Sequence, residues 1–389
     1  MELCLKSFAL IALILAGCAT TQPPNRIDQL INTPPFDHAI WGVYVEDDAG
    51  RVLYDINAHR LEMPASNRKL FSAATDANCL GLTTQLSTEL WREGDDIIVK
   101  GDGDPSFAST RHESPGFAPF VAALQTRGVT HVRHIIMDVS RFDRVTIPQS
   151  WEIGDLTSSD APPVDAIAYN ENVEGDDSVE DAAINAGQHL ADDLHFAHIN
   201  VDGAILLNVE PRAWSEKIAT IQSPMVAQLL MSVLKNSQNN YAEMLYKRSS
   251  PHGSYEESEV LERDFTINEA HIDGGEFFFR DGSGLTRRDL VTPAALVKLL
   301  RWMNAPERRG AWWLIMGEPG GEGTLRRRLT DIGPRLRAKT GTLTGVHTLS
   351  GVVAGKNGGY RYFSITINHH LAGEATRVID EIVREIAKF

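Results

Sequence analysis

Two residues with the chemistry of a nucleophile and a base, Ser66 and Lys69, lie three positions apart. Pro64 precedes them and neither Gly nor Pro occurs in the next two turns, so we expect a helix that begins just after Pro64. Residues three apart share a helix face, which would bring the Lys69 amine to the Ser66 hydroxyl, and the free N–H groups at the helix start could bind a negative oxygen. Alone the pattern is weak, because Ser is a common helix cap and Lys a common exposed helix residue.

A second polar pair, Ser237 and Asn239, follows a predicted helix at 224–235 and precedes another that starts at Tyr241. A tight connection between two helices can direct side chains into a cleft. Taken by itself, the pair is explained more simply by helix capping.

Lys339, Thr340 and Gly341 form a third set, at the start of a strand-like segment near the end of the chain. Each of the three motifs is common on its own. Their order along the chain, with the serine–lysine pair first and the serine–asparagine pair second, is the signature of penicillin-recognising serine enzymes. The ordered set, with matching local structure around each motif, makes coincidence a poor explanation.

The chain further resembles one family of these enzymes, the low-molecular-mass class C penicillin-binding proteins, which are D-alanyl-D-alanine carboxypeptidases and endopeptidases. The resemblance runs from about residue 38 to the C-terminus and includes a large insertion between the first and second motifs. The stretches that carry it are 64–66, 101–105, 281–285, 323–325 and 337–345.

The two ends of the chain are predicted to meet in one sheet. Residues 39–54 are typical of a β-hairpin, and strand-like segments at 348–353 and 360–367 precede a helix at 374–388 with an apolar face. We expect one antiparallel sheet with helices packed on it. The resemblance implies the same class, α+β: a β-lactamase/transpeptidase-like domain, an antiparallel sheet flanked by helices, with an inserted second α/β domain.

We divide the chain into a signal peptide, a tether, a catalytic domain in two pieces and an inserted domain. The signal peptide is expected at 1–17 and the tether at 18–35. The catalytic domain is expected at 36–80 and 216–389, and the inserted domain at 81–215.

The chain departs from the family pattern in two places. Longer members carry a third domain nested in the insertion, but here a helix at 179–196 follows the segment 168–173 so closely that we expect this domain to be absent. The second motif has Gln238 where Asp is frequent in the family. The Ser-x-Asn pattern leaves that position open, so we do not interpret Gln238 as a loss of activity.

The motif residues predict a division of labour. Ser66 would attack the amide of a D-alanyl-D-alanine terminus or cross-link. Lys69 would accept the serine proton, which requires a pKa lowered by burial and by the nearby charge of Lys339. Ser237 would relay the proton to the leaving nitrogen, and Asn239 would hold the substrate amide and Lys69.

The third motif would bind the far end of the substrate. Lys339, Thr340 and Thr342 would meet the terminal carboxylate, with Gly341 between the two threonines, and the backbone N–H groups of Ser66 and Thr342 would form the oxyanion hole. We expect no metal and no cofactor, since none of the His pairs among the 13 histidines has a carboxylate-supported metal pattern. β-Lactams are expected to be covalent inhibitors.

The N-terminus predicts export and a lipid anchor. Lys6 precedes an apolar run at 8–15 that is too short for a permanent membrane span. The run ends in a Leu-Ala-Gly-Cys sequence that resembles the bacterial lipoprotein processing box, in which Cys18 becomes the lipidated first residue. The residue after the cysteine is Ala19 and not Asp, and this resembles lipoproteins of Gram-negative bacteria that are sent to the outer membrane. We therefore expect a periplasmic, lipid-anchored protein, with an ordinary secretory signal as the alternative.

Composition and cysteine use restrict the partners. With 389 residues, 42% of them hydrophobic, the chain is long enough for two or three globular domains, and a net charge of -15 does not favour nucleic acid. Cys4 leaves with the signal and Cys18 would be lipidated, so no intramolecular disulfide is available. We expect the remaining Cys79 to be buried in the core.

Two other functions stay open. A β-lactamase or esterase on the same scaffold would use the same Ser66 and Lys69 but would deacylate rapidly. A lipid-anchored protein that binds cell-wall material without catalysis is a different class, with Gln238 as its support. Carboxypeptidase and endopeptidase reactions both break a bond after D-alanine, so both remain within the main hypothesis.

Overall fold

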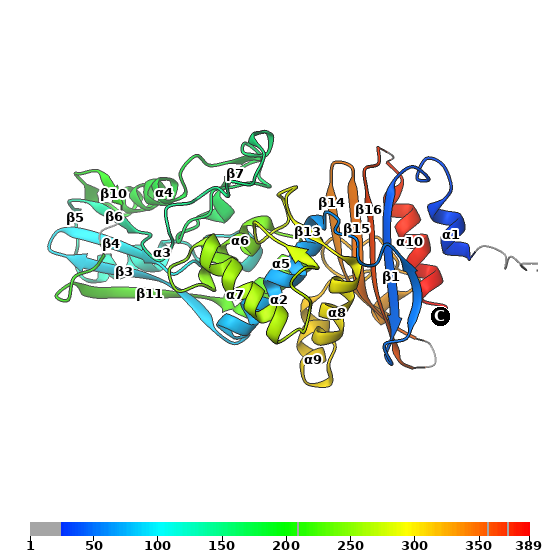
Figure 1. Cartoon of the computed structure of the whole chain (residues 1–389). Helices are drawn as coiled ribbons and strands as arrows, with labels where there is room; N and C mark the ends of the chain where they lie inside the picture. Colours follow the sequence, from blue (N-terminus) through cyan, green and yellow to red (C-terminus); the bar gives the residue numbers. More distant parts are fainter. Residues whose placement is uncertain (1–24, 208–209, 356–357, 372) are drawn as a thin grey trace, which may run out of the picture.

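The computed structural model describes residues 25–207, 210–355, 358–371 and 373–389, and it contains two five-stranded sheets. Figure 1 shows these sheets at opposite ends of an elongated molecule, with a group of helices between them.

The first sheet joins the two ends of the chain. All of its neighbouring strands are antiparallel, and β1 pairs with β16 from Ile40 opposite Asn368 to Asp47 opposite Arg361. The predicted hairpin and terminal antiparallel sheet are therefore confirmed. In spatial order the strands are β14 (Leu336–Leu343), β15 (Val346–Ala354), β16 (Tyr360–Asn368), β1 (Ile40–Asp47) and β2 (Val52–Ile56).

Helices cover both faces of this sheet. Helices α1 (Arg26–Ile31) and α10 (Ala375–Ile386) share a core with one face, and α8 (Pro293–Met303) packs on the other. Because both faces are covered, β15 and β16 are buried at nearly every position, including polar residues such as Ser350, Ser364 and Thr366. Leu336 and Ala338 of β14, the strand that carries the third motif, belong to the core on the α10 face, and β14 also contacts the 3-10 helix Ala65–Arg68.

Helix α2 lies in the middle of the molecule and follows directly from the first motif. Its first turn is a 3-10 helix, Ala65–Arg68, and the α-helix proper is Lys69–Leu80. The predicted helix after Pro64 is confirmed, and its residues from Lys69 to Asp76 are all buried. The helices that contact α2 are α5 (Val226–Leu234), α6 (Asn239–Arg248), α7 (Tyr255–Asn268) and α8, and α9 (Pro306–Ile315) packs on α5.

The expectation that Cys79 is a core residue is wrong. The buried part of α2 ends at Asp76, and the last turn of the helix extends beyond the elements that cover its start. Cys79 is an exposed free thiol on that turn.

The second sheet is mixed. Its strands β4, β6 and β10 are parallel, and β3 and β11 are antiparallel to their neighbours. In spatial order the strands are β10 (Ile205–Leu207), β6 (Ile135–Asp138), β4 (Asp96–Gly101), β3 (Gln85–Glu93) and β11 (Glu216–Met225). Helices α3 (Ala118–Thr126) and α4 (Ala182–Phe196) contribute to its core. Short pairs complete the fold: β5 (His131–Val132) with β9 (Asn200–Val201), β7 (Val173–Glu174) with β8 (Asp177–Ser178), and β12 (Phe277–Phe278) with β13 (Leu290–Val291).

Strand β11 changes the expected domain boundary. It pairs with β3 from Glu216 opposite Arg92 to Met225 opposite Gln85, so it is an edge of the second sheet and not part of the catalytic domain. The expected limit at 215 is therefore too early. We propose that the inserted domain extends from about residue 81 to 225 and that the catalytic domain resumes at α5.

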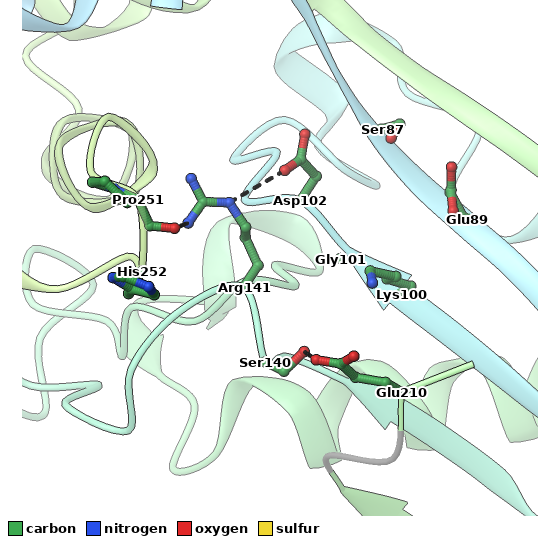
Figure 2. A pocket seen from close by; sticks show the side chains of 10 residues that line it. All are labelled: Ser87, Glu89, Lys100, Gly101, Asp102, Ser140, Arg141, Glu210, Pro251 and His252. Atoms are coloured by element: carbon green, nitrogen blue, oxygen red, sulfur yellow. Dashed lines mark hydrogen bonds and ion pairs between the residues drawn. The ribbon is translucent and has the colours of Figure 1, made fainter. Parts of the chain in front are cut away.

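Arg141 ties the two domains together. Its guanidinium donates to the carbonyl oxygens of Arg248, the last residue of α6, and of Ser250 and Pro251 just beyond it. Its Nε lies 3.6 Å from Asp102 Oδ1, in the inserted domain. Figure 2 shows Arg141 between Asp102 and Pro251, beside a hollow lined by residues of both domains. The volume of this hollow is about 380 Å³. The residues that line this hollow do not include the motif residues, so the hollow belongs to the domain junction and not to the chemistry predicted from the sequence.

We expect Gly341→Ala to be strongly destabilising. A Cβ on Gly341 would overlap Thr348 Oγ1 and lie 2.9 Å from both Pro64 O and Ser66 N, so β14 can lie against the 3-10 turn only with glycine at this position. The free energy of unfolding, measured by thermal denaturation, should fall by about 1–3 kcal/mol. Gly310→Ala, in α9 where a Cβ meets nothing within 4 Å, is the control and should be neutral or stabilising. Equal unfolding temperatures for the two variants would contradict the proposed close packing.

Candidate active site

The 3-10 turn places the first motif as predicted. Lys69 Nζ lies 3.0 Å from Ser66 Oγ, and the Lys69 side chain is fully buried while Ser66 is partly exposed. Ala65, just before the serine, has a φ of +46°, which is unusual for a residue with a side chain. The serine hydroxyl can therefore be reached by a substrate, while the amine beside it cannot be reached by bulk water.

The Lys69 amine has three acceptors. Besides Ser66 Oγ, it donates to Asn239 Oδ1 at 2.6 Å and to the carbonyl oxygen of Ser283 at 2.7 Å. An ammonium group uses all three acceptors, but a neutral amine has only two N–H donors. If Asn239 and Ser283 keep those two donors, the lone pair of the neutral amine lies toward the Ser66 hydroxyl, as a base requires.

Burial makes the neutral amine accessible near physiological pH. It lowers the pKa of Lys69 to about 8, against the opposing charges of Asp281, Glu243 and Asp160. The buried Arg68 guanidinium adds to the lowering. Burial was the expected cause of the low pKa, and it is the largest one.

The second motif lies at the junction of α5 and α6. Asn239 is the first residue of α6, and its Nδ2 donates to the carbonyl oxygen of Asp160 at 2.8 Å. Ser237, with a φ of +65°, accepts a hydrogen bond from Lys339 Nζ at 2.8 Å. The Asn239 amide is therefore oriented from the inserted domain, and Ser237 links the second motif to the third.

Gln238, the departure from the family pattern, is engaged by the inserted domain. In the amide orientation that satisfies its neighbours, its oxygen accepts from Arg111 at 2.9 Å and its nitrogen donates to Glu171 at 3.3 Å. The Glu171 carbonyl oxygen also accepts from Asn240 Nδ2 at 2.6 Å. Gln238 thus holds the turn that presents Ser237 and does not obstruct it.

Lys339 is a second buried lysine, and its charge and that of Lys69 disfavour each other. Lys339 is fully buried, and it donates to the Ser237 hydroxyl at 2.8 Å and to the Thr340 carbonyl oxygen at 2.7 Å. Burial and the neighbouring Lys69 charge hold the pKa of Lys339 well below its ordinary value. Because the repulsion between two positive charges acts on both groups, it opposes the charged form of Lys69 as well, beside the contribution of Arg68.

The rest of the third motif lies on β14 beside the nucleophile. Thr340 Oγ1 donates to Thr324 Oγ1 at 2.8 Å, and Thr342 is an exposed residue paired with His347 on β15. Gly341 lies against the Ser66 amide, because a Cβ there would be 2.9 Å from Ser66 N. The predicted carboxylate and oxyanion contacts remain predictions, since they require a substrate.

Several contributors to this site are not predictable from residue type. Ser283 and Asp160 act through carbonyl oxygens, which have no residue-type signal. Ser283 and Thr324 do lie in stretches on which the family resemblance rests, at 281–285 and 323–325, and this was the available signal. It marked the segments without indicating what each residue contacts.

The predicted signal peptide, the lipidation site Cys18 and the first part of the tether, residues 18–24, lie outside the described residues. The rest of the predicted tether is not a linker, because Arg26–Ile31 form helix α1 and its Ile27, Leu30 and Ile31 are buried in the core shared with α10. In the part of the chain that the structure describes, no helix has the length and apolarity needed to cross a membrane. The same described residues contain no group of three or more side chains placed to hold a metal ion.

Solved structures share this fold. Penicillin-binding protein 4 from Haemophilus influenzae superimposes with a TM-score of 0.83 at 20% sequence identity, over 94% of this chain and 100% of that one. A predatory peptidoglycan endopeptidase from Bdellovibrio bacteriovorus matches with a TM-score of 0.61 at 16% identity, over 90% of this chain and 92% of that one. At these identities the likeness shows the fold.

Sequence comparison gives the family. A D-alanyl-D-alanine carboxypeptidase from Actinomadura sp. strain R39 is 25% identical, with 96% of this chain and 86% of the relative aligned. That alignment has 469 positions, more than the 389 residues of this chain, so the relative carries segments with no counterpart here. The model of the D-Ala-D-Ala carboxypeptidase 3 (S13) family matches residues 24–176 and 171–388. The chain therefore belongs to the D-Ala-D-Ala carboxypeptidase 3 (S13) family.

Proposed function

We propose that this enzyme hydrolyses the peptide bond after D-alanine in peptidoglycan stem peptides or cross-links, through an acyl-enzyme on Ser66. The observation that carries the proposal is the convergence of three distant motifs. Lys69 contacts both Ser66 and Asn239, while Ser237 accepts from Lys339. Family membership agrees with this chemistry.

The reaction uses the two lysines differently. The neutral Lys69 amine takes the Ser66 proton as the hydroxyl oxygen attacks the carbonyl carbon of the substrate. The N–H groups of Ser66 and Thr342 stabilise the oxyanion. Ser237 gives its hydroxyl proton to the leaving nitrogen as the peptide bond breaks and takes a proton from the Lys69 ammonium, so that Lys69 is neutral again. Water then attacks the ester carbonyl carbon while Lys69 accepts its proton, and this proton returns to the Ser66 oxygen as the ester bond breaks.

Carboxypeptidase and endopeptidase reactions share this mechanism and differ in the leaving group. The names of the relatives include both activities. Purified protein incubated with peptidoglycan fragments, with products resolved by mass, separates the two. Loss of one terminal D-alanine identifies the carboxypeptidase, and conversion of cross-linked dimers to monomers identifies the endopeptidase. Intact substrates beside an active control enzyme would contradict the proposal.

The proposed compartment is outside the cytoplasm, because peptidoglycan cross-links are there. Cys18 is proposed to carry a lipid that holds the enzyme at the outer membrane through the tether. The nested third domain is proposed to be absent, which agrees with segments of the Actinomadura relative that have no counterpart in this chain.

Penicillin should acylate Ser66. A β-lactam places its reactive amide where the substrate peptide bond would lie, so intact-protein mass spectrometry should show a lasting adduct that maps to Ser66 and is absent in Ser66→Ala. Failure of the wild type to react, under conditions that label a known penicillin-binding protein, would argue against the assignment. Rapid loss of the adduct would favour the β-lactamase alternative.

Removal of Cys18 should release the protein. Membrane fractionation of cells that express wild type or Cys18→Ala should find the first with the membranes and the second in the soluble periplasmic fraction. Equal release of both would remove the lipid anchor and leave the enzymatic proposal intact.

Acylation should depend on pH through Lys69. Only the neutral amine accepts a proton, so the second-order rate with penicillin should rise as pH increases through about 8 and fall roughly tenfold per unit below it. Lys69→Ala should lose at least about 100-fold, and Lys69→Arg should do little better because guanidinium stays protonated. Wild-type rates in folded Lys69→Ala would require a different base.

Lys339 should respond differently to the same pair of substitutions. If it binds the substrate carboxylate as a cation, Lys339→Arg should keep part of the acylation rate and Lys339→Ala should lose more. Stopped-flow acylation of both variants, after circular dichroism confirms their folding, measures this. An equal and complete loss in Lys339→Arg and Lys69→Arg would contradict the division of labour.

A further inference from the structure

Glu243 is a fully buried carboxylate one helical turn beyond Asn239 on α6. Residues four apart on a helix share a face, so both side chains leave α6 on the same side. Asn239 reaches the Lys69 amine directly. Glu243 instead accepts from two consecutive backbone N–H groups, those of Gly282 at 2.9 Å and Ser283 at 2.7 Å.

These two donors belong to the segment that supplies the other acceptor of the base. The Ser283 carbonyl oxygen accepts from Lys69 Nζ at 2.7 Å. The next N–H group, that of Gly284, donates to Asp281 Oδ1 at 2.7 Å. Three consecutive N–H groups are thus held by buried carboxylates. Asp281 holds the peptide unit that contains the Ser283 carbonyl group, and Glu243 holds the two units before it.

Close packing also leaves the 282–284 segment little room to move. A Cβ on Gly282 would lie 2.8 Å from Tyr246 Cβ on α6, and a Cβ on Gly284 would overlap the Ala65 carbonyl oxygen beside the nucleophile. Gly284 also has a φ of +79°, which glycine adopts without strain. The segment therefore lies between α6 and the 3-10 turn of the first motif, in contact distance of both.

We propose that Glu243 is a positioning residue for the general base: it holds the Ser283 carbonyl oxygen against the Lys69 amine. One face of α6 then fixes both acceptors of the neutral amine, Asn239 directly and Ser283 through Glu243. This inference rests on the proposed function, in which the lone pair of Lys69 must lie toward Ser66.

A carboxylate suits this role better than its amide. Both oxygens of the ionised group accept hydrogen bonds, whereas glutamine would turn an NH2 group toward one of the two backbone donors and leave that N–H unpaired. Burial and the nearby Asp281 raise the pKa of Glu243, and the hydrogen bonds from the 282–283 backbone oppose that rise. A buried carboxyl with raised pKa costs stability, which a purely structural role would not require.

The electrostatic surroundings give the sign of the expected effect. Glu243 raises the pKa of Lys69, so removing its charge should lower that pKa, and loss of a fixed acceptor for the ammonium form acts in the same direction. The other titratable and charged groups around the pair are Arg68, Lys339, Asp160, Asp281, Lys247 and Tyr255.

The test is the pH profile of penicillin acylation in Glu243→Gln. We expect the limiting rate at high pH to fall by at least about tenfold, because the lone pair is no longer held toward Ser66, and the midpoint to move to lower pH by about 0.5 to 1 unit. A wild-type protein that is not acylated defeats the proposed function itself. A normally reactive wild type with an unchanged midpoint in Glu243→Gln defeats only this inference.

Asp76→Asn is the matched control. Asp76 is also fully buried, on α2, but it accepts from Ser249 Oγ at 2.7 Å and does not bond the 282–284 segment. Its pH midpoint should stay at the wild-type value, and an equal shift in both variants would overturn the proposal. If Glu243→Gln does not fold, Glu243→Asp keeps the charge but withdraws it from the segment. Its limiting rate should fall several-fold with a smaller midpoint shift, and a wild-type rate would overturn the proposal.

Discussion

A lysine amine can serve as a base near neutral pH only if it is kept from water and from close counter-ions, yet still held in place. Lys69 meets this condition, because its side chain is fully buried and its contacts are a hydroxyl, an amide oxygen and a peptide carbonyl. Neutral acceptors orient the amine without stabilising its charge as strongly as a carboxylate in contact would. The 3-10 turn before α2 supplies the hydroxyl of Ser66, α6 supplies the amide oxygen of Asn239, and the 282–284 segment supplies the carbonyl oxygen of Ser283.

The inserted domain contributes to the same environment. The Asp160 carbonyl oxygen orients the Asn239 amide, and Trp151 Nε1 donates to Asp281 Oδ2 at 2.9 Å. Asp281 in turn holds the backbone of Gly284, one residue after the carbonyl that accepts from Lys69. The two acceptors Asn239 and Ser283 therefore depend on residues of the insertion, Asn239 through a direct contact and Ser283 through Asp281. At the other end of α6, Arg141 also joins the insertion to the catalytic domain.

The fold and the motif residues could be predicted because both follow from spacing. Residues three apart meet on a helix, as Ser66 and Lys69 do, and apolar strands at both ends of the chain pair in one sheet. Contacts through the main chain have no such signal, so the role of Ser283 was not predicted. The surroundings of segments outside the motifs were also not predicted. Strand β11 was assigned to the catalytic domain and Cys79 to the core, because neither sequence indicates which elements pack beside it.

The surroundings of Lys339 show the same limit. A lysine in a substrate-binding motif suggests a permanent cation, but this one is fully buried and the groups to which it donates, Ser237 Oγ and the Thr340 carbonyl oxygen, are neutral. Burial and the Lys69 charge therefore hold the pKa of Lys339 well below its ordinary value before substrate binds. A substrate carboxylate beside Lys339 would oppose both effects and raise that pKa. The substrate would thus supply the counter-charge for Lys339, and a ligand without the carboxylate would lose this interaction.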